Sequence, residues 1–220
     1  MKLNKSQKII AAVIAAYFVG SVVQNILAVK TFEFHGVSTV AGGVLLTWMV
    51  FASGDIITEI LGKSFSLKCT VLGALASLTF SGVCAIAVAL PGNNSYVSEC
   101  YALVFGSTWR ISIASAIAYV GGGWINVQIM DRLHKRDGDR RYSLRSIVST
   151  IAGQLFDDYV FIFLAFAPFG ISAIENPWSA ILVMPLFSWV VETITGTLSV
   201  LITKPIVEKL KLETVREGVG

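Results

Sequence analysis

Three polar side chains interrupt an apolar segment that runs from Ile147 to Phe169 and is long enough to cross a bilayer. Gln154, Asp157 and Asp158 lie near its middle. At 100° per residue, Gln154 and Asp157 fall on one narrow helical stripe, and Asp158 lies at its edge. A carboxylate in hydrocarbon is costly and by default marks a functional site, so this stripe must face protein or water rather than lipid.

Other apolar segments carry further acids and one arginine. Glu192 lies close to mid-membrane when its depth is counted by the rise of a helix, and Arg110 is the only basic residue inside such a segment. Asp55 and Glu59 are four residues apart and therefore share a helix face. A count from the start of their segment at residue 36 puts Asp55 near the cytoplasmic boundary. Simple pairing with cytoplasmic basic residues such as Lys63 is therefore the alternative to a functional role.

The acids outnumber what one arginine can neutralise. One ion pair would satisfy Arg110, but the remaining carboxylates cannot all stay ionised in a low dielectric. They must be protonated, hydrated in a cavity, or matched by a bound cation or substrate. A pathway for a small polar solute is the favoured interpretation, because a structural salt bridge explains only one of these acids.

The composition is that of an integral membrane protein. The mean hydropathy is +0.72, 55% of the residues are hydrophobic and only 14% are charged, so residues 1–220 form one helical membrane domain. The net charge of +3 reflects cytoplasmic loops, because no basic stripe with interleaved aromatic residues indicates a nucleic-acid partner. The three cysteines show no pairing or metal spacing and both histidines lie in loops, so we expect no metal site and no cofactor.

Six apolar segments each exceed the ~20 residues that a spanning helix needs. They cover about 9–29, 36–58, 69–90, 101–130, 147–169 and 179–203. The first resembles a signal peptide, but its apolar run is too long and lacks a convincing cleavage site, so we interpret it as a retained helix. The sequence therefore predicts an all-α membrane protein with six transmembrane helices.

The loops predict the orientation and leave a repeat open. Lysine and arginine gather before the first helix, after the sixth, and in the loops after the second and fourth, whereas the other three loops together hold only Lys30. This asymmetry places both termini in the cytoplasm.

The sequence also suggests an internal repeat. The segment GDIITE (54–59) resembles GQLFDD (153–158), which suggests a three-plus-three inverted repeat, although matches of this length also arise by chance.

The fourth segment carries polar residues on two opposite faces. Arg110 projects one way, and Ser115, Tyr119 and Asn126 project nearly opposite, so protein must enclose this helix on both sides. Gly121–Gly123 allow either close packing of a neighbouring backbone or a local break. In the first segment, ordinary interhelical hydrogen bonding is the alternative to a site role for Tyr17, Ser21, Gln24 and Asn25.

Carboxylates, amides, an arginine and aromatic rings together suit a planar polar heterocycle. A guanine-like ring offers adjacent N–H donors to one carboxylate, a carbonyl edge to arginine or amide donors, and faces to aromatic side chains. An amino sugar or a simple cation would also suit the acids.

Four blocks of the sequence resemble a known family. SGDIITEILGK (53–63), RISIASAIAYVGGGWINVQI (110–129), RSIVSTIAGQLFDDYVFIFLAF (145–166) and ETITGTLSVLITKPIVEKL (192–210) are similar to those of the queuosine precursor transporter family, also called vitamin uptake transporters. The resemblance covers nearly the whole chain after the first helix. It implies a bacterial or archaeal inner-membrane importer, not an enzyme, whose substrate is a nitrile- or aminomethyl-substituted 7-deazaguanine.

With this resemblance, the polar residues receive expected roles. Glu192 or Asp157 receives the N–H edge of the ring, and Gln154, Asn126 and Arg110 act as donors. Tyr119, Trp48 or Trp189 stacks on the ring. A second group, Asp55, Glu59 and Asp158, serves as a gate or a proton relay.

Two alternatives stay open. The chain could be the substrate-binding subunit of an energy-coupling-factor vitamin transporter, since Ala11/Ala15 and Ala12/Ala16 form small-xxx-small pairs that dock a partner helix. A membrane enzyme such as an intramembrane protease is disfavoured, because no Gly-x-Ser-x-Gly or His-Glu-x-x-His motif is present. The expected partners are the deazapurine and the lipid bilayer, and the sequence leaves open a homo-oligomer and the energy source.

Overall fold

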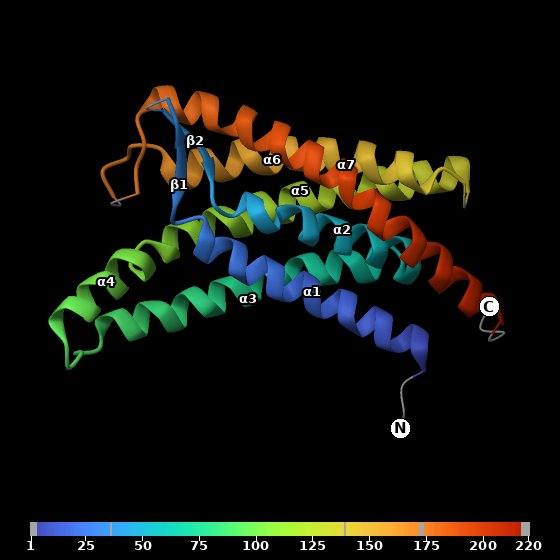
Figure 1. Ribbon diagram of the computed structural model, residues 1–220, viewed down its shortest axis with the longest axis horizontal. Helices are drawn as coiled ribbons and strands as arrows, with labels where there is room; N and C mark the ends of the chain where they lie inside the picture. Colours follow the sequence, from blue (N-terminus) through green and yellow to red (C-terminus); the bar gives the residue numbers. More distant parts are fainter. Residues whose placement is uncertain (1–3, 36, 139, 172–173, 217–220) are drawn as a thin grey trace.

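The computed structural model describes residues 4–35, 37–138, 140–171 and 174–216. Over these ranges the chain forms seven α-helices and one β-hairpin (Figure 1). The elements are α1 (Lys5–Leu27), β1 (Thr31–Phe34), β2 (Val37–Ala41), α2 (Val44–Leu61), α3 (Lys63–Ala89), α4 (Ser95–Phe105), α5 (Thr108–Asp137), α6 (Tyr142–Phe166) and α7 (Trp178–Arg216).

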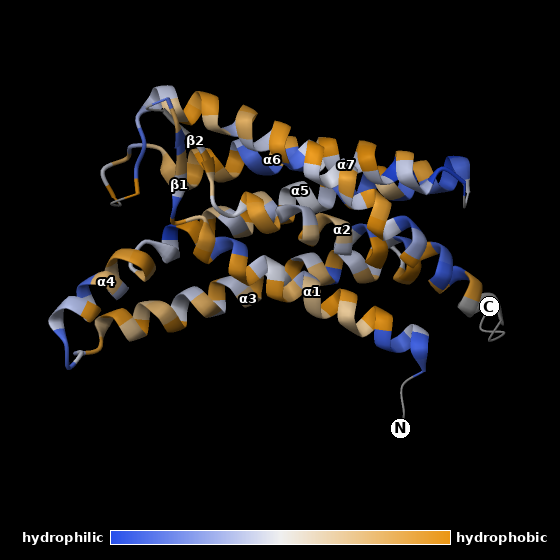
Figure 2. Cartoon of the chain, viewed as in Figure 1, coloured by the Kyte–Doolittle hydropathy of each residue, from blue (hydrophilic) through white to orange (hydrophobic). Residues whose placement is uncertain are grey.

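The expected all-α architecture with six membrane-spanning helices is confirmed. Six helical segments of the described chain are long and apolar enough to cross a membrane, with α4 and α5 counted together. Apolar residues cover most of their length and hydrophilic residues gather near the helix ends (Figure 2). The protein is therefore a multi-pass membrane protein. Its two termini lie at the same end of the bundle, which we call the termini end, and the hairpin lies at the opposite, hairpin end (Figure 1).

The helix expected over residues 36–58 begins later than predicted. Strand β2 occupies Val37–Ala41 and pairs antiparallel with β1, with Thr31 opposite Ala41. The β-branched residues of this stretch favour a strand. At Gly42 the chain passes close to the end of α1, and only glycine fits there, because an added Cβ would lie 2.4 Å from the Leu27 carbonyl oxygen. Counted from Val44, Asp55 is about 16 Å along α2 and lies in the half of the helix that ends at Leu61, while its depth in the membrane stays a prediction.

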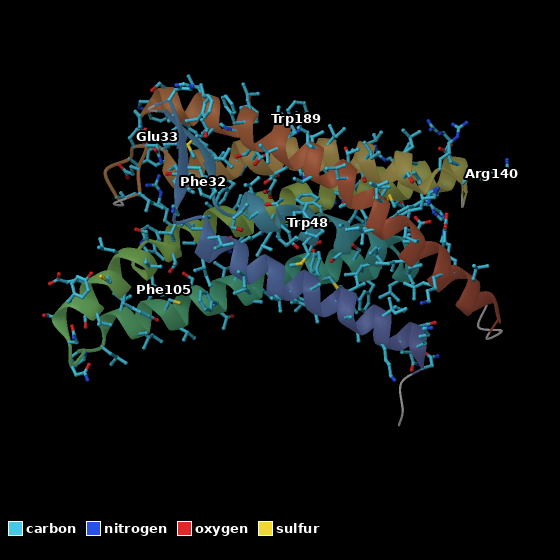
Figure 3. All side chains as sticks on the ribbon, viewed as in Figure 1. Phe32, Glu33, Trp48, Phe105, Arg140 and Trp189 are labelled. Carbon is cyan, nitrogen blue, oxygen red and sulfur yellow. The ribbon has the colours of Figure 1, made fainter. Side chains whose placement is uncertain are left out.

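Other helix boundaries also differ from the prediction. The single segment expected over 101–130 is divided into α4 and α5 at Gly106–Ser107. Helix α3 starts directly after Gly62, so Lys63 lies on a helix rather than in a loop. The basic residues expected in the fourth loop lie largely on the end of α5 and the start of α6, and they remain at the termini end (Figure 3, where Arg140 marks this end).

Helices α5 and α6 make the most extensive contact of any two elements. They cross at Gly122 and Gly153, where a Cβ on Gly122 would lie 2.8 Å from the Gly153 carbonyl oxygen and 3.0 Å from Asp157 Cβ. Helix α5 runs unbroken through Gly121–Gly123. The glycines therefore serve close packing, the first of the two predicted alternatives, and they bring Asp157 against α5.

Candidate functional site

A cavity toward the hairpin end gathers residues from five helices and the end of the hairpin. It measures about 420 Å³ when the open space at its mouth is included. Its lining comes from α1, β2, α2, α5, α6 and α7. The residues are Gln24, Asn25, Ala28, Ala41, Gly43, Val44, Thr47, Ser115, Asp157, Asp158, Phe161, Ile162, Ser188 and Glu192.

This cavity contains buried polar atoms that the protein does not satisfy. Within the described part of the chain, no hydrogen-bond partner is found for Gln24 Oε1, Asn25 Nδ2, Asp157 Oδ1, Asp158 Oδ2 or Glu192 Oε2. Leaving one such group unpaired costs about 1–3 kcal/mol, more when it is charged. Five of them around one cavity indicate that water or a ligand completes the site.

The acids of the cavity share one electrostatic environment. Asp157, Asp158 and Glu192 all line this one cavity, and each has a carboxylate oxygen without a partner among the described residues. Among the described lining residues none is a lysine, arginine or histidine. The predicted meeting of Asp157 and Glu192 in one cavity is therefore observed, with Asp158 as a third member, whereas their predicted roles toward a substrate stay predictions.

Tyr119 and Asn126 lie in a different place. They line a second, smaller cavity with Tyr17, whose ring centroid is 6.0 Å from that of Tyr119. Neither residue belongs to the lining of the acidic cavity. Asn126 packs at the crossing of α5 with α6, where a Cβ added to Gly153 would lie 3.1 Å from Asn126 Cβ.

Asp55 is fully buried and is held by neutral donors. Its carboxylate accepts hydrogen bonds from Asn126 Nδ2 at 2.8 Å, from Thr150 Oγ1 at 3.3 Å and from the Ser146 hydroxyl. The suggested partner Lys63 instead donates to Gln128 Oε1 at 2.7 Å and lies 3.5 Å from Asp131. Asp55 therefore does not pair with Lys63, and this alternative from the sequence is wrong for Asp55.

Glu59, one helical turn further along α2, is held by cations. Its carboxylate is paired with Arg145 at 2.6 Å and with Lys211 at 2.5 Å, and His134 Nδ1 lies 3.4 Å away. The side chains of Glu59 and Arg145 are 1% and 0% exposed. Arg145 also donates to the carbonyls of residues 138 and 140. This cluster joins α2, α6 and α7 at the termini end.

Arg110 lies at the hairpin end and outside the acidic cavity's lining. Its guanidinium pairs with Glu175 at 2.9 Å and donates to the carbonyl oxygens of Leu164 at 2.9 Å and Ala167 at 2.5 Å. The expectation that an intramembrane acid neutralises it is corrected, because the acid is Glu175 of the loop before α7.

The remaining predicted residues lie around the cavity rather than in it. Gln154 is fully buried without a partner for either amide atom among the described residues, and it faces Gly196 of α7. Trp48 Nε1 donates to the Leu45 carbonyl, and Trp189 Nε1 donates to that of Ile151, both at 3.0 Å. Figure 3 shows both tryptophans near mid-length of the bundle.

Several site residues were missed or undervalued in the sequence. Arg145 was counted as a loop residue, and extending the polar helical stripe of α6 one turn back from Ser149 would have found it. For Gln24 and Asn25 the sequence leaves ordinary interhelical hydrogen bonding and a site role open, and both residues line the acidic cavity. No local signal pointed to Glu175 or Lys211, because their partners are distant in sequence.

A bundle of six spanning helices around a buried, acid-lined cavity defines a polytopic membrane protein with an internal polar site. Comparison with known proteins makes this more specific. The profile of the vitamin uptake transporter family matches residues 41–204. The chain belongs to this family, which consists of transporters and not of enzymes.

A curated relative agrees with this assignment. A protein of Bacillus subtilis (strain 168), described as a probable queuosine precursor transporter, is 27% identical over 148 residues. The aligned region covers 66% of this chain and 64% of the relative. No solved structure matches the chain significantly.

Proposed function

We propose that this protein imports a queuosine precursor, a 7-deazaguanine with a nitrile or aminomethyl substituent, across the inner membrane of a bacterium or archaeon. The observation that carries the proposal is the cavity with five unpartnered buried polar atoms. The relative's description as a probable queuosine precursor transporter supports the choice of substrate.

The polar atoms of the cavity match the edges of such a ring. Glu192 or Asp157 accepts the adjacent N–H groups, because a carboxylate offers two acceptor oxygens. Asn25 Nδ2 is an unpartnered donor in the same cavity and replaces Arg110 as the group that donates to the ring carbonyl. Phe161 is the aromatic ring in the lining and takes the stacking role, while Tyr119, Trp48 and Trp189 shape the surrounding helices.

The clusters on α2 supply the gate. The ion pairs of Glu59 with Arg145 and Lys211 tie three helices together at the termini end and keep the cavity closed on the cytoplasmic side. Asp55, Asn126 and Gln154 lie between this gate and the cavity as a buried polar relay. Asp55 can exchange a proton there, because its three hydrogen-bond partners, Asn126, Ser146 and Thr150, are all neutral.

Uptake of labelled precursors by cells that cannot synthesise them tests the proposal. Cells that express the protein should accumulate label, and Glu192→Gln should lose most of this uptake. Glu99→Gln is the matched control, because Glu99 is an exposed acid outside the cavity. Equal accumulation with and without the protein would refute import of these compounds. Uptake that requires co-purifying ATPase subunits would favour the energy-coupling-factor alternative.

A further inference from the structure

A pocket at the termini end, which we call the termini-end pocket, repeats the lining pattern of the acidic cavity. It measures about 400 Å³ when the open space at its mouth is included. From α5 it takes three lining residues with the spacing i, i+1 and i+4, which are Met130, Asp131 and His134. From the end of α1 the acidic cavity takes three residues with the same spacing, which are Gln24, Asn25 and Ala28. Two helices therefore present the same pattern to cavities at opposite ends of the bundle.

The helix that follows each of these two repeats the agreement. The termini-end pocket takes residues with the spacing i, i+1, i+4 and i+5 from α2 and the start of α3, which are Thr58, Glu59, Gly62 and Lys63. From α6 the acidic cavity takes residues with that same spacing, which are Asp157, Asp158, Phe161 and Ile162. Such a spacing is common on a helix face. The sequence match of residues 54–59 with 153–158 is a separate observation, and it has this same register.

The two helix pairs run in opposite directions. Helix α1 runs from the termini end to the hairpin end and α2 returns, whereas α5 runs from the hairpin end to the termini end and α6 returns (Figure 1). Gly54 and Gly153, which the sequence match aligns, both lie close to the preceding helix. Their added Cβ atoms would lie 3.3 Å from Tyr17 Cε2 and 2.9 Å from the Gly122 carbonyl oxygen. In an inverted repeat of this kind, a site at one end has a counterpart at the other.

Glu59 presents one unpartnered oxygen in the termini-end pocket. Arg145 and Lys211 both donate to Glu59 Oε1. Its Oε2 has no hydrogen-bond partner among the described residues, although the side chain is only 1% exposed, and His134 Nδ1 lies 3.4 Å away. Lys63 lines the same pocket. A buried acceptor and a lysine donor in one pocket suit a ring that carries N–H groups and a carbonyl.

We propose that the termini-end pocket is a second binding site for the transported heterocycle, the cytoplasmic counterpart of the acidic cavity. This inference rests on the proposed function and adds a release site to it. Glu59 Oε2 accepts a ring N–H group, and Lys63 donates to the ring carbonyl. Substrate in this pocket shares the Glu59 carboxylate with Arg145 and Lys211, so its binding weakens the ion pairs that close the gate.

Protection of a cysteine in the pocket lining tests this site. The native cysteines of the full chain are replaced by serine, and the purified His134→Cys variant is labelled with a maleimide. Either 7-deazaguanine, at about ten times the Kd of the site, should slow this labelling about tenfold. Asp131→Cys, in the same lining, should be protected in the same way. Arg132→Cys is the matched control, because Arg132 is exposed and outside the lining, and its labelling rate should not change.

Combining His134→Cys with Glu192→Gln separates a second site from a conformational change. Glu192→Gln disables only the acidic cavity, so protection should persist in the combined variant. Asp157→Asn takes its place if Glu192→Gln does not fold. Loss of protection in the combined variant, or equal slowing of Arg132→Cys, overturns the second site and leaves the proposed function standing.

Calorimetric titration of the parent chain distinguishes the two proposals. If a deazaguanine binds to the parent chain but protects neither His134→Cys nor Asp131→Cys, the second site is overturned and the proposed function stands. If neither deazaguanine binds to the parent chain, the proposed function itself is overturned.

Discussion

Two buried arginines hold opposite ends of α6. Arg110 pairs with Glu175 near the last turn of the helix, and Arg145 pairs with Glu59 near its first turn. Each arginine also donates to two backbone carbonyl groups. A guanidinium suits both places, because its planar set of N–H groups satisfies a carboxylate and several carbonyls at once.

The two clusters differ in what they connect. The partners of Arg110 belong to the end of α6 and the loop that follows it, where Glu175 also accepts from the backbone N–H groups of Gly170 and Ile171. Glu59 instead lies on α2 and is shared with Lys211 of α7. The Arg110 pair joins the start of α5 to the end of α6 and the loop after it, whereas the Glu59 cluster joins α2, α6 and α7 and must break if these three helices separate. We therefore assign a capping role to Arg110 and a gating role to Arg145.

The largest expected effect is an all-or-none difference in labelling between the two ends. In a chain with its native cysteines replaced by serine, a membrane-impermeant maleimide should label a cysteine at Asn94 in intact cells. It should reach a cysteine at Asp137 only after permeabilisation, because basic residues gather at the termini end. The reverse pattern would put the Arg145 cluster on the outside and turn the proposed exit gate into an entrance.

Arg145→Ala should cause the next largest effect. It leaves the 1% exposed Glu59 carboxylate with Lys211 and the nearby His134, and breaking a buried pair costs about 3–5 kcal/mol. Size-exclusion chromatography should show little folded protein, and uptake should be lost. Arg145→Lys should restore only part of both, because it loses the planar fork. An Arg145→Ala variant that folds and transports like the parent would remove the distinction between the two arginines.

Arg110→Ala should cost less, on the order of 1–3 kcal/mol, because Glu175 is 16% exposed and can be hydrated once its partner is gone. The midpoint of thermal unfolding should fall, while the folded fraction should bind substrate with the affinity of the parent, since Arg110 is outside the cavity lining. Loss of binding at unchanged stability would instead place Arg110 in the substrate site.

Lys211→Met should have the smallest effect on stability. The Lys211 side chain is 28% exposed and Arg145 still pairs with Glu59, so the loss should be about 1 kcal/mol or less. Transport rate should change more than stability, because the contact between α2 and α7 is weakened. Lys204→Met is the matched control, since its contact with Glu208 is 3.9 Å long and both side chains are exposed. Equal changes in rate for the two variants would argue against a gate.

The sequence alone was sufficient to identify the class of protein and to predict that certain acids are functionally important. Helix length and hydropathy are local properties, so six spanning segments could be recognised from one chain. Asp157 and Glu192 stood out because an acid in an apolar segment is costly wherever that segment packs. The start of α2 was misjudged, because residues 37–41 are as apolar as a helix would be and differ only in their β-branched pattern.

Only the tertiary structure decided which polar groups meet. Tyr119 and Asn126 share α5 with Ser115, which lines the acidic cavity, yet they line the second cavity together with Tyr17 of α1. Arg145 and Glu59 are 86 positions apart in the sequence, and Lys211, which also pairs with Glu59, is 152 positions away from it. A helical stripe fixes the direction of a side chain relative to its own helix, but the rotation and crossing of neighbouring helices determine what that side chain faces.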